Sequence, residues 1–219
     1  MMMKYQILNN NNEHWKHPVT GLPIRLYRII AMKSFTFISP NGGTVNIKEG
    51  EIGGFVASER NLPQDDSSWI FNQAKVFDNA TIKDSIVRDD AWVYGNSYLE
   101  NSVVSGKSHI SKNAKLFKTY STDNVDVADD SVVINSELLN GSKIVGSSQV
   151  NDSFCSGASR ISNSVVSFTK MFDQSEICKG SLVDNCVLRG RSVINGKQLK
   201  NQSLEENHEL HEIVGTEAS

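Results

Sequence analysis

The sequence predicts an all-β protein built as a triangular parallel β-helix, and three observations lead to this fold class. The chain of 219 residues contains 28 Ser and 21 Asn, and its four prolines all precede residue 64. From residue 68 onward, a small residue, any residue and an aliphatic residue recur in steps of about six. From Ile70 to Cys155 the aliphatic positions are spaced 6, 6 and 5 residues apart without a break, which makes a period of 17 residues.

Each step corresponds to one flat side of a solenoid, and three sides complete one coil. The aliphatic residue points inward, and so does the small residue two positions earlier, because side chains alternate along a strand. Corners between the sides need unusual backbone angles, which Gly, Asn and Asp adopt most easily. Pairs such as Gly95-Asn96 and Asn140-Gly141 fall at these corners. The excess of Ser therefore follows from the small inward positions, and the excess of Asn follows from the corners.

The repeat divides the chain into three parts. Residues 1–66 contain all four prolines and form a small β-rich N-terminal cap. Residues 67–199 form the β-helix of about eight coils of 16–17 residues, in which inner strands have to donate their backbone N–H groups and therefore exclude proline. Residues 200–219 are a polar C-terminal tail, in which 205–214 either form a short helix or stay disordered.

Composition excludes several classes of protein. A net charge of −3 with mixed signs argues against a nucleic-acid binder, which needs a basic patch. The chain contains no run of 18 apolar residues, the length that a membrane-spanning segment needs. Its start lacks the apolar core of a secretory signal. Three cysteines without metal-ligand spacing indicate a reducing, cytoplasmic protein, and we expect no metal and no cofactor.

Three segments at the start of the repeat carry a resemblance to a known family. The segments 50–56 (GEIGGFV), 59–62 (ERNL) and 68–70 (SWI) resemble the start of YdcK-like proteins. These are bacterial and prophage-borne proteins with a small cap and a left-handed β-helix of the hexapeptide-repeat type. The resemblance covers about residues 27–199, and it implies left-handed winding and a phage or prophage origin. It assigns no activity to individual residues, since a fold does not decide a function.

One side of the predicted solenoid carries an outward apolar stripe. Such a stripe along most of a rod exceeds the apolar patch that a monomer exposes, so it has to be covered. Self-association into a symmetric dimer or trimer is the favoured interpretation, and coverage by the cap or the tail is the alternative. The predicted interface residues are Trp69, Ile86, Val103, Tyr120, Leu139, Phe154, Met171 and Val187.

Two further features lie on the outside of the coils. The aromatic residues Phe77, Trp92, Tyr94 and Tyr98 lie on neighbouring coils near the cap, where they either support the cap or bind a ligand or partner. His109 is the only histidine within residues 67–199, and it faces outward. It is the candidate general base if the protein is an enzyme.

These features favour a non-enzymatic, rigid binding or scaffold protein, encoded by a phage or prophage, that acts on a host or phage protein through its flat faces. An acyl-CoA-dependent acyltransferase of the hexapeptide-repeat type, with His109 as base, is the enzymatic alternative. It is less favoured because the repeat has no inserted loop that would shape an acceptor site. The third hypothesis is a sponge protein, which binds a nucleotide or another small signal between its subunits and so counters host defence. For all three hypotheses we expect the protein in the host cytoplasm.

Overall fold

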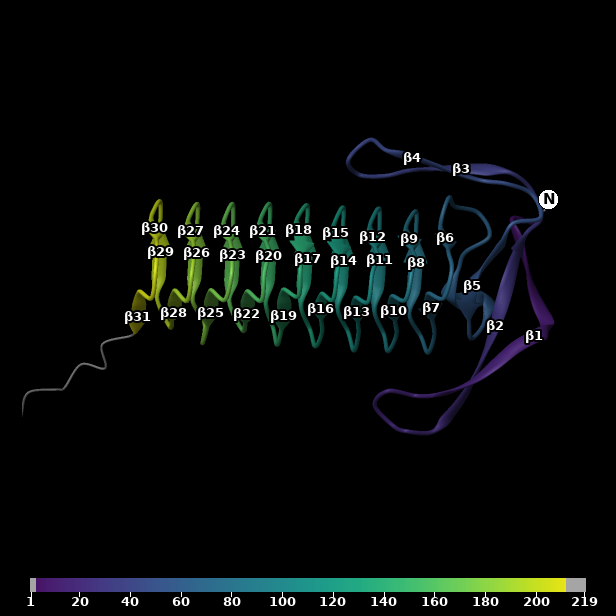
Figure 1. The fold of residues 1–219 in the computed structure, drawn as a ribbon, viewed down its shortest axis with the longest axis horizontal. Helices are drawn as coiled ribbons and strands as arrows, with labels where there is room; N and C mark the ends of the chain where they lie inside the picture. Colours follow the sequence, from purple (N-terminus) through teal and green to yellow (C-terminus); the bar gives the residue numbers. More distant parts are fainter. Residues whose placement is uncertain (1–2, 212–219) are drawn as a thin grey trace, which may run out of the picture.

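The computed structural model describes residues 3–211 and confirms an all-β solenoid made of parallel stacked coils. Figure 1 shows a straight rod with the N-terminal cap at one end. Two hairpins of the cap, β1–β2 and β3–β4, extend beside the first coils of the rod. The cap consists of β1 (Tyr5–Lys16), β2 (Pro23–Ala31), β3 (Phe35–Ile38), β4 (Thr44–Ile47), β5 (Ile52–Val56) and the short 3-10 helix η1 (Glu59–Asn61).

Three sheets form the sides of the rod, and we call them A, C and D. Their stacked strands pair in parallel, whereas β1, β2 and β5 at the start of sheet A pair antiparallel with one another, and the β3–β4 hairpin is a separate two-stranded sheet. Sheet A begins with β1, β2 and β5 and continues with β7 (Lys75–Val76), β10 (Trp92–Val93), β13 (His109–Ile110), β16 (Asp126–Val127), β19 (Lys143–Val145), β22 (Arg160–Ser162), β25 (Glu176–Cys178), β28 (Val193–Asn195) and β31 (Glu209–His211). Sheet C contains β6 (Trp69–Ile70), β9 (Ile86–Val87), β12 (Val103–Val104), β15 (Tyr120–Thr122), β18 (Glu137–Leu139), β21 (Phe154–Cys155), β24 (Lys170–Met171), β27 (Val187–Leu188) and β30 (Ser203–Leu204). Sheet D contains β8 (Thr81–Lys83), β11 (Tyr98–Glu100), β14 (Lys115–Phe117), β17 (Val132–Ile134), β20 (Gln149–Asn151), β23 (Val165–Ser167), β26 (Leu182–Asp184) and β29 (Gln198–Lys200).

The solenoid is longer than the sequence predicts at both ends. Strand β5 of the predicted cap already pairs in parallel with β7. Beyond residue 199, where a polar tail is predicted, β30 pairs with β27 and β31 pairs with β28, so sheet C has nine strands rather than about eight. Residues 209–211 form a strand instead of the helix or disordered segment considered for 205–214. Residues 212–219 of the predicted tail lie outside the described residues.

The inward register is correct except in one coil. The prediction places Phe172 inside and Met171 outside, but Met171 is fully buried and pairs with Cys155 and Leu188 of the neighbouring coils. The coil between Cys155 and Met171 is one residue shorter than the preceding ones. Thr169, also fully buried, therefore takes the small inward position two residues earlier.

Small inward residues at the corner between sheets D and C form two ladders, one through Ser68, Ser85, Ser102 and Thr119 and one through Ser136, Ser153, Thr169 and Cys186. The Ser102 hydroxyl donates to the carbonyl oxygen of Glu100 at 2.9 Å and accepts from the backbone N–H of Thr119 at 3.1 Å. The N–H of Ser102 in turn donates to the hydroxyl of Ser85 at 3.0 Å. Because these groups are buried, each hydroxyl pairs a backbone donor that would otherwise be left unsatisfied.

The corners use left-handed backbone, as the sequence predicts. Among the described residues, 21 non-glycine residues have positive φ, and 16 of them are Asn or Asp. Short polar side chains tolerate this conformation because they hydrogen-bond locally. The exceptions are Lys112, Lys118, Phe168, Lys179 and Glu206.

We predict that Ser102→Ala lowers the free energy of unfolding by about 1 to 2 kcal/mol, because it removes the acceptor of a buried N–H group. Urea unfolding followed by circular dichroism measures the change. Ser147→Ala is the matched control, since Ser147 is exposed and only its backbone N–H is bonded. Equal midpoints for the two variants would contradict a stabilising role of the ladder.

Candidate functional site

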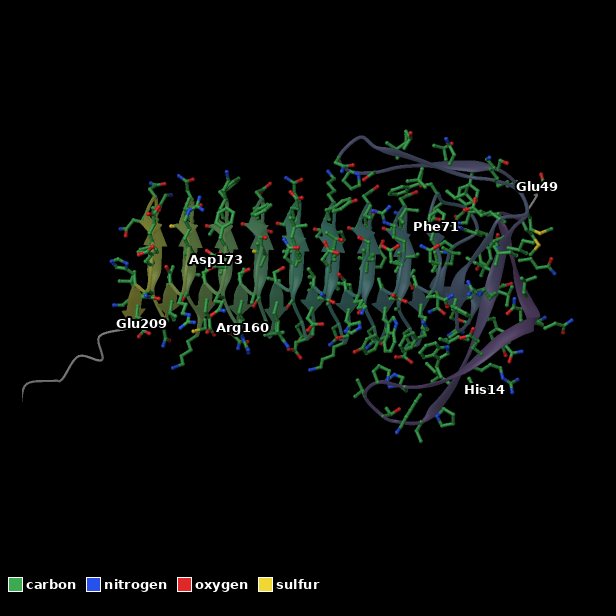
Figure 2. All side chains as sticks on the ribbon, in the orientation of Figure 1. His14, Glu49, Phe71, Arg160, Asp173 and Glu209 are labelled. Carbon is green, nitrogen blue, oxygen red and sulfur yellow. The ribbon has the colours of Figure 1, made fainter. Side chains whose placement is uncertain are left out.

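The β3–β4 hairpin covers the first coils of sheet C (Figure 1). Phe37 and Ile47 on its inner side are each 1% exposed, and the ring of Phe35 lies 5.7 Å from that of Trp69 in an edge-to-face arrangement. Phe71, labelled in Figure 2, packs beside Trp69 in the same layer. The cap thus provides the apolar cover that sheet C requires at this end.

This cover changes the predicted interface. Trp69, Ile86 and Val103 are at most 4% exposed, so an intermolecular partner cannot reach them. Met171 belongs to the core, because the register shift turns it inward. Of the eight predicted interface residues, Tyr120, Leu139, Phe154 and Val187 remain half-buried on the outer side of sheet C.

Beyond the hairpin, sheet C keeps an uncovered apolar area, which we call the distal surface and define by Leu139, Phe154, Phe168, Phe172 and Val187. The rings of Phe154 and Phe172 lie 5.5 Å apart, and the guanidinium of Arg189 lies 4.5 Å from the Phe172 ring. A hollow of about 440 Å³ joins this surface to the tip of the hairpin. The hollow is lined by Pro40, Asn41, Lys118, Tyr120, Asn135, Ser136, Glu137, Asp152, Ser153, Phe154, Phe168 and Lys170.

Sequence reasoning missed two residues of the distal surface: Phe172, which the prediction places inside the rod, and Phe168. The side chain of Phe168 is 61% exposed and its φ is 49°, a conformation that is unfavourable for a bulky residue. The same corner position carries Lys118, Asn135 and Asp152 in the three preceding coils and Asn185 in the next. An aromatic residue in a column that otherwise carries polar or charged side chains is a sequence signal for this site.

The β1–β2 hairpin packs on the first coils of sheet A, and Lys75 lies at the centre of this contact. Its ammonium nitrogen is 3.9 Å from the ring centre of Trp15 and 5.5 Å from those of Phe55 and Trp92. It donates to the carbonyl oxygen of Gln73 at 2.7 Å. Lys75 is only 3% exposed, and this burial lowers its pKa.

His17 attaches the tip of the same hairpin, although the sequence shows no partner for it. Its Nε2 lies 3.0 Å from the Asp78 carboxylate, while its Nδ1 accepts from the backbone N–H groups of Val19 and Thr20. The imidazole also packs edge-on against Phe77 and Tyr94, whose rings stack 5.0 Å apart. This arrangement fits the neutral imidazole, because Nδ1 is used as an acceptor.

The predicted aromatic cluster is therefore divided. Phe77, Trp92 and Tyr94 contact the β1–β2 hairpin and support the cap. Tyr98 lies on sheet D instead, where its hydroxyl donates to Glu100 at 3.0 Å and its ring lies 5.8 Å from that of Phe117. Tyr94 directly follows β10 of sheet A, whereas Tyr98 begins β11 of sheet D. The corner between these two strands therefore places the two side chains on different sides of the rod.

His109 lies on sheet A between Trp92 and Asp126. Its Nδ1 is 3.4 Å from Asp126 Oδ1, and its ring centre is 5.2 Å from that of Trp92. Lys143 Nζ approaches the other carboxylate oxygen of Asp126 at 3.7 Å. The contact with His109, assisted by Lys143 and opposed by partial burial, lowers the pKa of Asp126. A carboxylate that orients an imidazole is one element of a general base.

The described residues contain no group of three His, Cys, Asp or Glu side chains that could hold a metal ion. Over the same residues, no helix has the length and apolar character needed to cross a membrane. Burial raises the pKa of Cys155 to about 12, so this thiol acts as a core side chain.

We predict that Met171→Asp destabilises the fold much more than Phe154→Asp does. Met171→Asp places an unpaired carboxylate in the core and lowers the free energy of unfolding by about 3 kcal/mol or more. Phe154→Asp changes a half-buried outer residue and costs roughly 1 kcal/mol. Thermal unfolding of both variants measures the difference, and equal losses would contradict the inward register of Met171.

The Asp126 contact leads to a pH prediction. Because the pKa of Asp126 is lowered in the folded protein, the stability that this contact contributes is present above the ordinary carboxyl pKa and is lost as pH falls through the lowered pKa. We expect His109→Leu to raise the pKa of Asp126 in an NMR titration. Asp129, whose pKa is lowered mainly by Lys112, is the internal control. An unchanged pKa of Asp126 would exclude His109 as the main cause.

Comparison with known proteins adds no family assignment. No protein-family model matches the chain, and no curated protein matches it significantly. The β-solenoid is therefore established from the stacking of its own coils, and function has to be argued from the surfaces that this stacking creates.

Proposed function

We propose that the protein is a non-enzymatic, rigid binding scaffold that associates with a second copy of itself through the distal surface of sheet C. The observation that carries the proposal is Phe168, which exposes an aromatic ring in a strained backbone conformation and lines the same hollow as Phe154. Strain of this kind concentrates at functional sites. The other non-glycine left-handed corner residues are polar or charged, and most of them are Asn or Asp.

The covered half of sheet C supports apolar association. There the chain already buries Trp69, Ile86 and Val103 beneath its own hairpin, so the outer side of this sheet accepts an apolar layer. The distal surface continues that side with no cover among the described residues. Its rim carries both signs of charge, Lys118 and Lys170 beside Glu137 and Asp152, as a self-complementary contact requires.

The biological setting follows from the sequence resemblance alone. The YdcK-like start of the repeat supports left-handed winding, a phage or prophage origin and a cytoplasmic host or phage protein as target. An assembled rod would present its remaining flat faces to such a target, and its stiffness comes from the coil-to-coil hydrogen bonds.

An acyltransferase is the second candidate, and one observation favours it. Asp126 contacts Nδ1 of His109, while Nε2 of this ring has no hydrogen-bond partner among residues 3–211. An imidazole arranged in this way can accept a proton from an acceptor group. The scaffold ranks first because the repeat between residues 68 and 199 has no inserted loop that would shape an acceptor site.

We predict that the wild-type protein is a dimer or trimer by size-exclusion chromatography with light scattering, and that Phe168→Asn dissociates it. The same substitution should raise the free energy of unfolding of the subunit by roughly 1 kcal/mol, because Asn relieves the left-handed strain. Weaker association and a more stable subunit are opposite effects, so simple misfolding cannot imitate the result.

The matched control is Ile134→Asp, which places a charge on a 39% exposed residue of sheet D. This variant should keep the mass of the wild type. A monomeric wild-type protein, or an unchanged mass for Phe168→Asn, would overturn the assignment of the distal surface.

A further inference from the structure

A second hollow, separate from the distal surface, lies where the β1–β2 hairpin ends on sheet A. It has a volume of about 360 Å³ and we call it the ring hollow. Trp92 and His109 lie on neighbouring strands of its sheet, and Trp15 of the hairpin meets Trp92 edge-on at 5.9 Å. The ring hollow is lined by Trp15, Lys75, Asp90, Trp92, Lys107, His109, Asn124 and Asp126.

At the corner beside the ring hollow, Asn72 and Asp89 bond between coils, but the next position of this corner lacks the side-chain ladder found at the following corner of the same coils. At that following corner Asn79 bonds to Asn96 and Asn96 bonds to Asn113, each at 3.0 Å. Asn113 continues the ladder to Asp130 at 2.8 Å.

At the ring hollow the equivalent column is Asp90, Lys107 and Asn124. None of these three side chains has a hydrogen bond or ion pair within residues 3–211, although Asp90 and Lys107 carry opposite charges one coil apart. The indole N–H of Trp92 and Nε2 of His109 are likewise without a partner in that range. The ring hollow therefore offers donors and acceptors that the fold itself does not use.

The walls of the ring hollow are held in place before any ligand arrives. Trp15 is fixed by the Lys75 ammonium at 3.9 Å and by donating its own N–H to Glu13 at 2.9 Å. His17, two residues along the chain, anchors the hairpin tip to Asp78. A preformed site avoids the cost of ordering side chains on binding.

We propose that the ring hollow binds an uncharged planar heterocycle of the nucleobase class, stacked on Trp92 and His109. Stacking on aromatic rings suits any base, and the unpaired groups of Asp90, Lys107 and Asn124 can meet the donors and acceptors at its edge. The charges of Asp90 and Lys107 cancel, which favours a neutral ligand. This activity goes beyond the proposed scaffold and uses a different sheet.

Two other ligand classes fit the surroundings less well. The place of a cation among the rings is already occupied by the Lys75 ammonium. Phosphate groups would need more than one free cation. Lys107 is unpaired among the described residues, but Asp90 lines the same hollow, and further along sheet A Lys112 pairs with Asp129, Lys143 with Asp126, and Arg160 with Glu176. Arg160, labelled in Figure 2, lies on the sheet A side of the rod beyond the ring hollow.

Tryptophan fluorescence tests the proposal, because the chain has three tryptophans and Trp69 is fully buried away from the ring hollow. Quenching by a ligand in the hollow therefore reports on Trp15 and Trp92. The full chain is titrated with adenosine, guanosine, cytidine and uridine, and with ribose and methyl glucoside as sugar probes. We expect saturable quenching by at least one nucleoside and none by ribose.

Asn124→Ala should lower the affinity for that nucleoside at least fivefold, and Trp92→Leu should lower it at least tenfold. Binding to the Trp92→Leu variant is measured by calorimetry, because the substitution removes a fluorophore. Tyr98→Phe, on sheet D, is the matched control and should bind as the wild type does.

Quenching by methyl glucoside equal to that by nucleosides would reassign the hollow to sugars and overturn the proposal. Absence of nucleoside binding, or binding unchanged in both hollow variants, would also overturn it. None of these outcomes depends on self-association, which Phe168→Asn reports separately.

Discussion

Stacking of each coil on the next is the constraint on which the rest of the structure depends. A backbone N–H of one coil donates to a carbonyl one coil further on, as Trp92 does to Ser108 and Tyr98 does to Ala114. Such a ladder continues only if every coil has nearly the same length and turns at the same three places. This requirement explains small inward residues, left-handed corners and the absence of proline after residue 63. The hydroxyl ladder through Ser85, Ser102 and Thr119 then satisfies buried backbone donors that the sheets leave at the corner.

The same stacking gives the rod flat faces, and the cap decides which parts of them stay accessible. Each hairpin covers the first coils of one sheet and then ends, so the β3–β4 tip borders the distal surface and the β1–β2 tip borders the ring hollow. Both candidate sites therefore combine residues at or near a hairpin tip with side chains from several coils. A binding site of this form can change along the ladder without disturbing the core, because outward residues are free of the inward pattern.

The inward pattern was predictable from the sequence because it repeats, whereas departures from the repeat were not. Met171 and Phe172 are both large and apolar, and only the one-residue shortening of the corner decides that Met171 points inward. The burial of Trp69 could not be separated from the exposure of Phe154 by sequence alone. Both occupy the same position in their coils, and what differs is the reach of a hairpin that lies far away in the chain. His17 gave no signal at all, since its partner Asp78 is distant in sequence.

The amino-acid sequence by itself determined the solenoid, its three sides and the periodic identity of core and corner residues. These follow from local rules: alternation along strands, the volume available at each inward position and the backbone angles that Asn, Asp and Gly tolerate. The tertiary structure alone decided how far the coils continue past residue 199, which half of sheet C is covered and which polar groups remain unpaired beside Trp92. Those outcomes depend on contacts between segments far apart in the chain. A periodic pattern carries no information about such contacts, because the pattern is the same in every coil.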